Sequence, residues 1–311
     1  MIVLNILLLI VGFVLLIKGA DFFVDGSSSV ARLLKVPSVI IGLTIVAMGT
    51  SAPEASVSIS AAIAGSNEIA VSNVVGSNIF NMLVVVGVCA AMKPFDLNKK
   101  ILKRDFPINI VANAVVLLFI VIGSSIARID GIIMLLIMAA YISYLVIDAM
   151  RNREEVSEDV KVMSPLVSII CIIGGLAAII FGGNLVVNNA TEIARAVGWS
   201  ETFIGLTIVA VGTSLPELVT SAVAAKKGEN GLALGNVVGS NIFNLLLILG
   251  LSGSISPITV DTRAIINTSV LLIMTVAMYL VCLIKKKLGR GIGIAMVSLY
   301  VAYTVYLVIV G

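Results

Sequence analysis

The sequence predicts an all-α membrane protein in which ten transmembrane helices form two inverted five-helix repeats. Three observations predict this fold class. The 311 residues are 59% hydrophobic and only 12% charged, whereas soluble domains carry about 25% charged residues. Apolar runs long enough to cross a bilayer recur along the chain, and the mean hydropathy is +1.17. One polar pattern also occurs twice at a constant spacing.

The composition excludes a disordered chain and argues against a soluble enzyme. The chain has no histidine, so it lacks the commonest proton shuttle and transition-metal ligand. Its 3 cysteines all lie within apolar runs, which argues against a disulfide framework or a zinc site. We therefore expect a polytopic membrane protein rather than an enzyme, with a lipid bilayer around it and with neither a cofactor nor a nucleic-acid partner.

Ten segments satisfy the length that a transmembrane helix requires, which is roughly 17–25 mostly apolar residues. The first segment has no basic start and no small-residue cleavage site, so we interpret it as a span rather than a signal peptide. Continuously apolar runs such as 132–138 favour helices over the alternating strands of an outer-membrane barrel. The predicted spans lie near residues 2–25, 38–64, 69–92, 106–126, 130–150, 165–187, 201–225, 230–254, 264–284 and 291–310.

The distribution of basic residues predicts the orientation in the membrane. The chain has 20 lysines and arginines, and all except Arg128, Arg195 and Arg263 lie in the odd-numbered connections between the predicted spans. Cytoplasmic loops carry the excess of these residues. We therefore predict cytoplasmic odd-numbered connections, with both termini on the extracytoplasmic side.

The chain contains an internal duplication. IGLTIVA occurs at 41–47 and 204–210, and NVVGSNIFN occurs at 73–81 and 236–244, both with an offset of 163. This predicts a first repeat at 1–150, a cytoplasmic linker at 151–164 and a second repeat at 165–311. Because each copy holds an odd number of spans, the second copy must run the opposite way through the membrane. Many secondary transporters have this inverted organisation, with the substrate site near the midplane. A duplicated scaffold without transport is the alternative.

The second and seventh predicted spans are interrupted by the pattern Gly-Thr-Ser-x-Pro-Glu, at 49–54 and 212–217. Proline removes a helical hydrogen bond, and glycine relaxes the backbone. Unwound backbone at membrane depth is tolerated only where it is buried or lines a cavity. Freed carbonyls, hydroxyls and a carboxylate together form a hard oxygen site, which suits Na⁺, Ca²⁺ or Mg²⁺.

Glu54 and Glu217 are the acidic residues predicted in the middle of spans, at equivalent repeat positions. An ionisable residue in the bilayer costs roughly 3 kcal/mol and marks a functional site. Two neighbouring carboxylates cannot both stay ionised without a cation, and the third and eighth spans contain no lysine or arginine. A bound cation or protons must therefore neutralise the pair. The alternative is that each glutamate caps a half-helix.

The third and eighth spans supply further polar groups. Ser77 and Asn81 lie four residues apart, on one helical face, and Ser240 and Asn244 repeat this spacing. For Asn81 and Asn244 we favour contact with the ion. The other asparagines of the motif are Asn73 and Asn78 with their copies Asn236 and Asn241; interhelical hydrogen bonding is an alternative role for them.

Two copies of five spans, each with this helix break followed by Gly-Ser-Asn-Ile-x-Asn, closely resemble the calcium/cation antiporter superfamily. The resemblance covers nearly the whole chain and is greatest to the prokaryotic sodium/calcium exchangers. It implies a monomeric transport unit that exchanges Ca²⁺ for Na⁺ across the cell membrane by alternating access. It also implies that the first and sixth helices slide across a core formed by the second, third, seventh and eighth helices.

The resemblance also implies a role for each motif residue. Glu54 and Glu217 would coordinate Ca²⁺ and Na⁺, with Asn81 and Asn244 as central polar residues of the site. The further Ca²⁺ ligands would be the backbone carbonyls of Thr50 and Thr213. The further Na⁺ ligands would be Ser51, Ser77, Ser214 and Ser240, with the carbonyls of Ala47 and Ala210.

The second motif departs from the family at one position. Asn244 stands where the well-known sodium/calcium exchangers usually have aspartate, so the site carries two formal negative charges rather than three. Two charges balance one Ca²⁺ but balance three Na⁺ less well. A proton-coupled cation antiporter of the same fold is therefore the main alternative. A passive cation channel is a further alternative.

Overall fold

The computed structural model describes residues 2–151, 162–200, 204, 207–208 and 210–310. In these ranges eight helices are long and apolar enough to cross a membrane, and a bent helix pair forms a ninth candidate. This confirms a multi-pass membrane protein that is almost entirely helical. Parts of the predicted linker 151–164 and of the predicted seventh span 201–225 lie outside the described residues. The count of ten helices and the linker stay predictions.

The helices of the first half and the second half follow a similar order along the chain. The first half contains α1 (Ile2–Leu33), α2 (Ser38–Ile41), η1 (Gly42–Val46), α3 (Ala47–Thr50), α4 (Ala52–Ile63), α5 (Asn67–Phe80), η2 (Asn81–Val85), α6 (Val86–Met92), η3 (Ile101–Asp105), α7 (Phe106–Gly123) and α8 (Arg128–Arg151), where η marks π-helical turns. The second half contains α9 (Pro165–Ala196), α11 (Ala210–Gly212), α12 (Leu215–Lys227), α13 (Asn230–Ile242), η5 (Phe243–Ile248), α14 (Leu249–Ile255), α15 (Thr262–Lys285) and α16 (Arg290–Val310).

The centre of the molecule is formed by two continuous helical segments, 69–92 and 230–255. In their most apolar stretches 83% and 94% of the residues are buried, whereas none of the other long spans among the described residues exceeds 33%. A span that is buried on all sides must lie inside the bundle rather than against lipid. These two segments carry the repeated NVVGSNIFN pattern, so the duplicated polar residues lie at the core.

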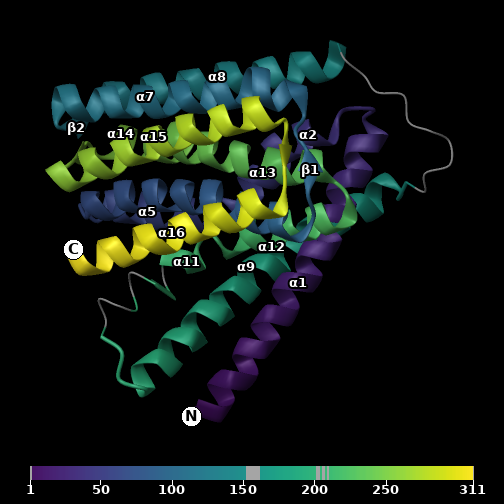
Figure 1. Ribbon diagram of the computed structural model, residues 1–311, viewed down its shortest axis with the longest axis horizontal. Helices are drawn as coiled ribbons and strands as arrows, with labels where there is room; N and C mark the ends of the chain where they lie inside the picture. The colour runs from purple at the N-terminus through teal and green to yellow at the C-terminus, as the bar shows by residue number, and fades with distance from the viewer. Residues whose placement is uncertain (1, 152–161, 201–203, 205–206, 209, 311) are drawn as a thin grey trace.

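Helices α1 and α9 form a separate pair that crosses the remaining helices obliquely (Figure 1). Each helix is 32 residues long, so both continue well past the predicted ends at 25 and 187. The longer α1 places Asp21 and Asp25 inside a helix rather than near its end, which corrects the sequence-based boundary. A helix of 32 residues spans about 48 Å, which is longer than the hydrocarbon core and favours a tilted path.

Glycines make the contact between α1 and α9 very close. A methyl group on Gly19 would lie 2.8 Å from the carbonyl oxygen of Gly175, and one on Gly182 would lie 2.7 Å from that of Gly12. Further along the same contact, a methyl group on Gly26 would meet the carbonyl oxygen of Ser168 at 2.7 Å. Small residues allow membrane helices to pack backbone against backbone. The pair therefore fits together along its length as a single packed unit.

Two short strand pairs join the copies at opposite ends of the helical stack (Figure 1). Strand β1 (Phe95–Asp96) pairs antiparallel with β4 (Lys287–Leu288), and β2 (Ser125–Ile126) pairs antiparallel with β3 (Ile258–Thr259). The repeat offset of 163 relates β1 to β3. Each copy therefore supplies one strand to each pair, and the connections of the two copies are tied together at both ends.

Asp105 was expected in a connection, but it lies fully buried in a π-helical turn. Its carboxylate accepts hydrogen bonds from Arg104 Nε at 2.7 Å and from the hydroxyl of Tyr141 on α8 at 3.1 Å. Arg104 also donates to Asp148 at 2.7 Å. A buried carboxylate needs such partners. This network fastens the start of α7 to α8.

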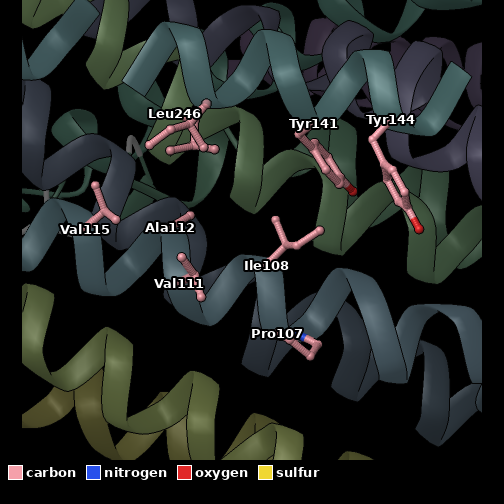
Figure 2. Close-up of a pocket in the computed structure, with 9 residues that line it drawn as sticks. Pro107, Ile108, Val111, Ala112, Val115, Tyr141, Tyr144 and Leu246 are labelled. Carbon is pink, nitrogen blue, oxygen red and sulfur yellow. The ribbon is translucent and has the colours of Figure 1, made fainter. Parts of the chain in front are cut away.

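A cavity of about 310 Å³ lies between α7 and α8, and Figure 2 shows residues that line it. Tyr141 and Tyr144 from α8 line it together with Ile108 and Val111 from α7 and Leu246 from η5. Val111 and Tyr144 are more than half exposed, so the cavity opens toward the bilayer. Its lining is almost wholly apolar and carries no charged side chain. Such a surface suits lipid chains rather than a cation.

Candidate cation site

The predicted break in the second span is a real bend. Segments 38–50 and 52–63 meet at an angle of 50°, and Ser51 at the junction has non-helical φ and ψ of −81° and 7°. Pro53 occupies the first turn of α4 and cannot donate a backbone hydrogen bond, so the helix restarts there. Glu54 thus lies in the first turn of a new helix, where the helix dipole stabilises a negative charge.

The second copy repeats this local structure. Ser214 precedes α12 with φ and ψ of −92° and 5°, Pro216 lies in the first turn, and Glu217 follows it. Both copies therefore present a glutamate at the N-terminus of a half-helix. The carboxylates are held by the same backbone arrangement that the proline and the serine create.

Glu54 is fully buried. Its Oε1 atom accepts hydrogen bonds from the hydroxyls of Ser77 at 2.9 Å and Ser214 at 3.1 Å. Its Oε2 atom has no hydrogen-bond partner in the described part of the chain. A buried carboxylate oxygen without a partner carries a large desolvation cost, which a cation or a proton at this atom would reduce.

Glu217 has a matching environment. It is also fully buried, and its Oε1 atom accepts a hydrogen bond from Ser51 at 3.0 Å. Its Oε2 atom likewise lacks a partner among the described residues. Each glutamate therefore takes a hydrogen bond from the break serine of the other copy. The two helix breaks are brought together by the fold.

Asn81 and Asn244 add a second pair of oxygens. Both side chains are fully buried. Asn81 Nδ2 donates to Asn241 Oδ1 at 3.2 Å, and Asn244 Nδ2 donates to Asn78 Oδ1 at 2.9 Å. The Oδ1 atoms of Asn81 and Asn244 have no partner within the described ranges. Each asparagine therefore leaves one oxygen available for a ligand.

The central asparagines lie in π-helical turns, which the sequence did not predict. Asn81 begins η2, and Asn244 lies within η5. A single π-helical turn inserts one residue into a helix and occurs frequently at functional sites. Segment η2 packs against α12, which carries Glu217, while η5 packs against α4, which carries Glu54. The turns thus place the amides beside the half-helices of the glutamates.

The four buried oxygens of Glu54, Glu217, Asn81 and Asn244 that lack partners in the described chain belong to two carboxylates and two amides, which together carry two formal negative charges when the carboxylates are ionised. None of the ion pairs formed by the described residues involves Glu54 or Glu217. Carboxylate and amide oxygens are ligands for hard cations such as Ca²⁺ and Na⁺. Two carboxylates that lack basic partners need a cation or protons to balance them. The chemistry of these residues therefore fits the Ca²⁺ and Na⁺ that the family resemblance implies.

The threonines of the two breaks differ in their surroundings. Thr50 Oγ1 lies 3.0 Å from Asn236 Oδ1 and 3.1 Å from the backbone oxygen of Val46. Thr213 Oγ1 has no partner in the part of the chain that the structure describes. The proposed carbonyl ligand Ala47 lies 3.4 Å from the hydroxyl of Ser240. Ala210 is the first residue of α11.

The sequence allows two roles for Asn73 and Asn236, contact with the ion or hydrogen bonding between helices. Asn73 Nδ2 donates to Ser58 Oγ at 2.9 Å and to the backbone oxygen of Glu54 at 3.2 Å. Asn236 Nδ2 donates to Ser221 Oγ at 2.9 Å. Both asparagines therefore form hydrogen bonds between the helices that carry the motifs. Ser58 and Ser221 act as their acceptors.

The family comparison agrees with this geometry. The family model for the sodium/calcium exchanger protein matches residues 4–147 and again residues 167–309. The chain is 40% identical to CaxA of Alkalimonas amylolytica, with 90% of each chain covered. It is 34% identical to the sodium/calcium exchanger MaX1 of Methanosarcina acetivorans, with 99% of each chain covered.

A solved structure matches along nearly the whole chain. The sodium-calcium exchanger NCX_Mj, from a crystal soaked with Na⁺ and Sr²⁺, superposes with a TM-score of 0.85 at 32% identity. The match covers 97% of this chain and 98% of the other. The chain therefore belongs to the sodium/calcium exchanger family and shares the fold of its membrane-embedded cation exchangers.

Proposed function

We propose that the protein is a secondary antiporter that exchanges Ca²⁺ for Na⁺ across the cell membrane by alternating access, with one chain as the transport unit. One observation carries the proposal. Four buried oxygens without hydrogen-bond partners in the described chain occur as two repeat-related pairs. They are Oε2 of Glu54 and Glu217 and Oδ1 of Asn81 and Asn244. This donor set matches a hard cation and explains why polar residues occupy the core of an apolar bundle.

The proposal assigns a role to each motif residue. Glu54 and Glu217 would bind Ca²⁺ directly, together with the backbone carbonyls of Thr50 and Thr213. The same two glutamates would bind Na⁺. The Na⁺ sites would also use Ser51, Ser77, Ser214 and Ser240 and the carbonyls of Ala47 and Ala210. Support comes from the serine hydroxyls, three of which already lie 2.9–3.1 Å from a glutamate oxygen.

We further propose that the two copies are inverted and that both termini are extracytoplasmic. Reciprocal contacts support an approximate two-fold relation: Ser51 bonds Glu217 while Ser214 bonds Glu54. The strand pairs β1–β4 and β2–β3 exchange partners between copies at opposite ends of the stack (Figure 1). A two-fold axis in the membrane plane would relate the two copies in this way, because it places equivalent connections at opposite ends of the stack. The distribution of lysines and arginines supports the orientation.

Charge balance supplies a mechanism for coupled exchange. Without a cation, the carboxylates of Glu54 and Glu217 repel each other and resist transfer into a dehydrated state. One Ca²⁺ balances both charges, so the loaded site can be covered on both sides. Na⁺ ions bound at the glutamates and the serines would achieve the same neutralisation. The carrier would therefore return loaded with one ion or the other.

Helices α1 and α9 are the proposed moving unit. Their glycine contacts lock them to each other, whereas they cross the other helices obliquely (Figure 1). At one end, ion pairs connect α1 to the α12–α13 connection. Lys227 Nζ lies 2.6 Å from Asp25 Oδ1 and 3.4 Å from Asp21 Oδ1, and Arg32 lies 2.6 Å from Glu229.

These ion pairs predict unequal stability of the two access states. The positions offset by 163 from Asp21, Asp25 and Lys227 are Asn184, Asn188 and Ala64, which cannot form the same ion pairs. Replacing Lys227 with alanine should release this end of α1. Each exposed pair contributes roughly 0.2–1 kcal/mol, so amide exchange in α1 residues 21–33 should rise a few-fold, measured by hydrogen–deuterium exchange mass spectrometry.

The matched control for this measurement is Glu192→Gln. Glu192 forms an exposed ion pair with Arg195 on the same helix, so its loss leaves the contact between α1 and α12 intact. Exchange in residues 21–33 should then remain at the unmodified rate. Equal exchange in Lys227→Ala and the unmodified protein would contradict the role of this contact.

The deciding test of the proposed function is ⁴⁵Ca²⁺ uptake into proteoliposomes loaded with Na⁺ and diluted into Na⁺-free buffer at equal internal and external pH. Uptake should require internal Na⁺ and should be absent from liposomes loaded with K⁺. Uptake that ignores Na⁺ but follows an imposed pH gradient would instead establish proton coupling. Flux that needs no counter-ion would establish a channel.

A further inference from the structure

We propose that Asn78 and Asn241 are positioning residues that orient the amide oxygens of Asn244 and Asn81 toward the transported cation. The inference rests on the proposed function of the same site, and it assigns a task to two residues that do not themselves contact the ion. It depends on the direction of four hydrogen bonds between the third and eighth predicted spans.

A backbone carbonyl fixes the orientation of Asn78. Asn78 Nδ2 lies 3.1 Å from the backbone oxygen of Asn241, and a carbonyl oxygen can only accept a hydrogen bond. The amide nitrogen of Asn78 must therefore face that carbonyl, which leaves its Oδ1 atom on the opposite side. That oxygen lies 2.9 Å from the side-chain amide of Asn244.

The orientation of Asn244 follows from that of Asn78. Because Asn78 Oδ1 can only accept, Asn244 must turn its Nδ2 atom toward it. The Oδ1 atom of Asn244 is then directed away from Asn78, and it has no partner among the described residues. A backbone acceptor thus determines, through two side chains, that Asn244 offers an oxygen rather than an N–H group.

The second copy contains the same chain of hydrogen bonds. Asn241 Nδ2 donates to the backbone oxygen of Asn78 at 3.2 Å, and Asn241 Oδ1 accepts from Asn81 Nδ2 at 3.2 Å. Asn81 Oδ1 remains without a partner in the described ranges. We name these four asparagines, Asn78, Asn81, Asn241 and Asn244, the asparagine clamp. Each copy orients the ligand of the other.

Burial makes this orientation necessary. All four side chains of the asparagine clamp are fully buried, so water cannot compensate for a wrongly turned amide. If Asn244 turned over, its oxygen would face the oxygen of Asn78, and its N–H groups would face the cation. Both contacts are repulsive. Groups that orient metal ligands in this way typically contribute roughly 10–100-fold to metal affinity.

The test is a double-mutant cycle on ⁴⁵Ca²⁺ binding to purified full-length protein, measured by scintillation proximity without a Na⁺ gradient. Asn78→Ala should raise the Kd for Ca²⁺ roughly 10–100-fold. In an Asn244→Ala background, Asn78→Ala should add little, because it acts through the oxygen that has already been removed. In an Asn81→Ala background, it should retain its full effect.

The control variant is Asn113→Ala. Asn113 is equally buried, but its amide donates within its own helix, to the backbone oxygen of Asn109 at 2.9 Å. Its replacement should leave the Kd for Ca²⁺ unchanged. This control separates the loss of an oriented ligand from the general effect of removing a buried amide.

Full additivity of Asn78→Ala with Asn244→Ala would overturn the inference, and so would an unchanged Kd in folded Asn78→Ala protein. If Asn78→Ala does not fold, Asn241→Ala tests the reciprocal half of the asparagine clamp against Asn81→Ala with the same expected pattern. Absence of Ca²⁺ binding by the unmodified protein would instead contradict the proposed function.

Discussion

Replacing Glu54 with glutamine should abolish Ca²⁺ exchange. The Oε1 atom of Glu54 accepts hydrogen bonds from Ser77 and Ser214, so the glutamine oxygen is expected to keep this place. The new NH₂ group would then occupy the position of the Oε2 atom, which lacks a partner among the described residues, and would present N–H groups to the cation. Breaking a buried charge pair costs roughly 3–5 kcal/mol, which corresponds to a loss of about 100-fold or more in Ca²⁺ affinity.

Glu217→Gln should have the same effect, because Ser51 holds its Oε1 atom in a similar way. Both variants should fold, since glutamine has nearly the same volume and can keep the serine contacts. The measurement is Na⁺-driven ⁴⁵Ca²⁺ uptake into proteoliposomes, with protein integrity checked by size-exclusion chromatography. Glu192→Gln on the exposed surface of α9 is the matched control and should transport normally. Normal uptake by either core variant would rule out its assigned role.

Placing leucine at Gly175 should separate α1 from α9 and stop transport. Even a single methyl group at this position would lie 2.6 Å from the backbone oxygen of Gly19 and 2.6 Å from the backbone nitrogen of Phe23. Backbone atoms cannot rotate away as a side chain does, so the helices must move apart. Such overpacking costs about 1–3 kcal/mol. We expect a lower midpoint of thermal unfolding in detergent and little Na⁺-driven Ca²⁺ uptake.

The neighbouring residue provides the control. Gly174 lies on the same helix, but a methyl group there would have no atom within 4 Å among the described residues. Gly174→Leu should therefore leave both the unfolding midpoint and the uptake near their original values, because leucine favours the helix over glycine. If Gly175→Leu behaved like Gly174→Leu, the close contact of α1 with α9 would not be required for transport.

The sequence predicted the structure best where a local physical constraint, such as the hydropathy of a span or the backbone of proline, decides the conformation. Apolar length alone located most of the spans, because the bilayer accepts only long apolar helices. The repeated pattern with proline located the bend at Ser51, since proline cannot continue a helix. The ends of α1 and α9 were predicted too early, because Asp21, Asp25 and Asn188 interrupt the apolar pattern without interrupting the helix.

The duplicated motif also placed Glu54, Glu217, Asn81 and Asn244 at the core of the bundle, and the structure shows all four fully buried. The sequence could not predict the π-helical turns at the two central asparagines, because those turns depend on packing between helices rather than on local propensity. Asp105 was expected in a loop because its burial also depends on packing between helices. Its hydrogen-bond partner Tyr141 lies far along the chain, and so does Asp148, which accepts a hydrogen bond from the neighbouring Arg104.

By itself, therefore, the sequence determined the membrane environment, the duplication and the helix breaks, and it predicted the residues that we propose for the cation site. These properties follow from hydropathy, local backbone chemistry and repetition, which are all readable along one chain. Only the tertiary structure decided which side-chain oxygen of Glu54, Glu217, Asn81 and Asn244 lacks a hydrogen-bond partner among the described residues. That outcome depends on hydrogen bonds between the two copies, such as Asn78 to Asn244 and Ser214 to Glu54, and directional bonds of this kind exist only once the copies have packed together.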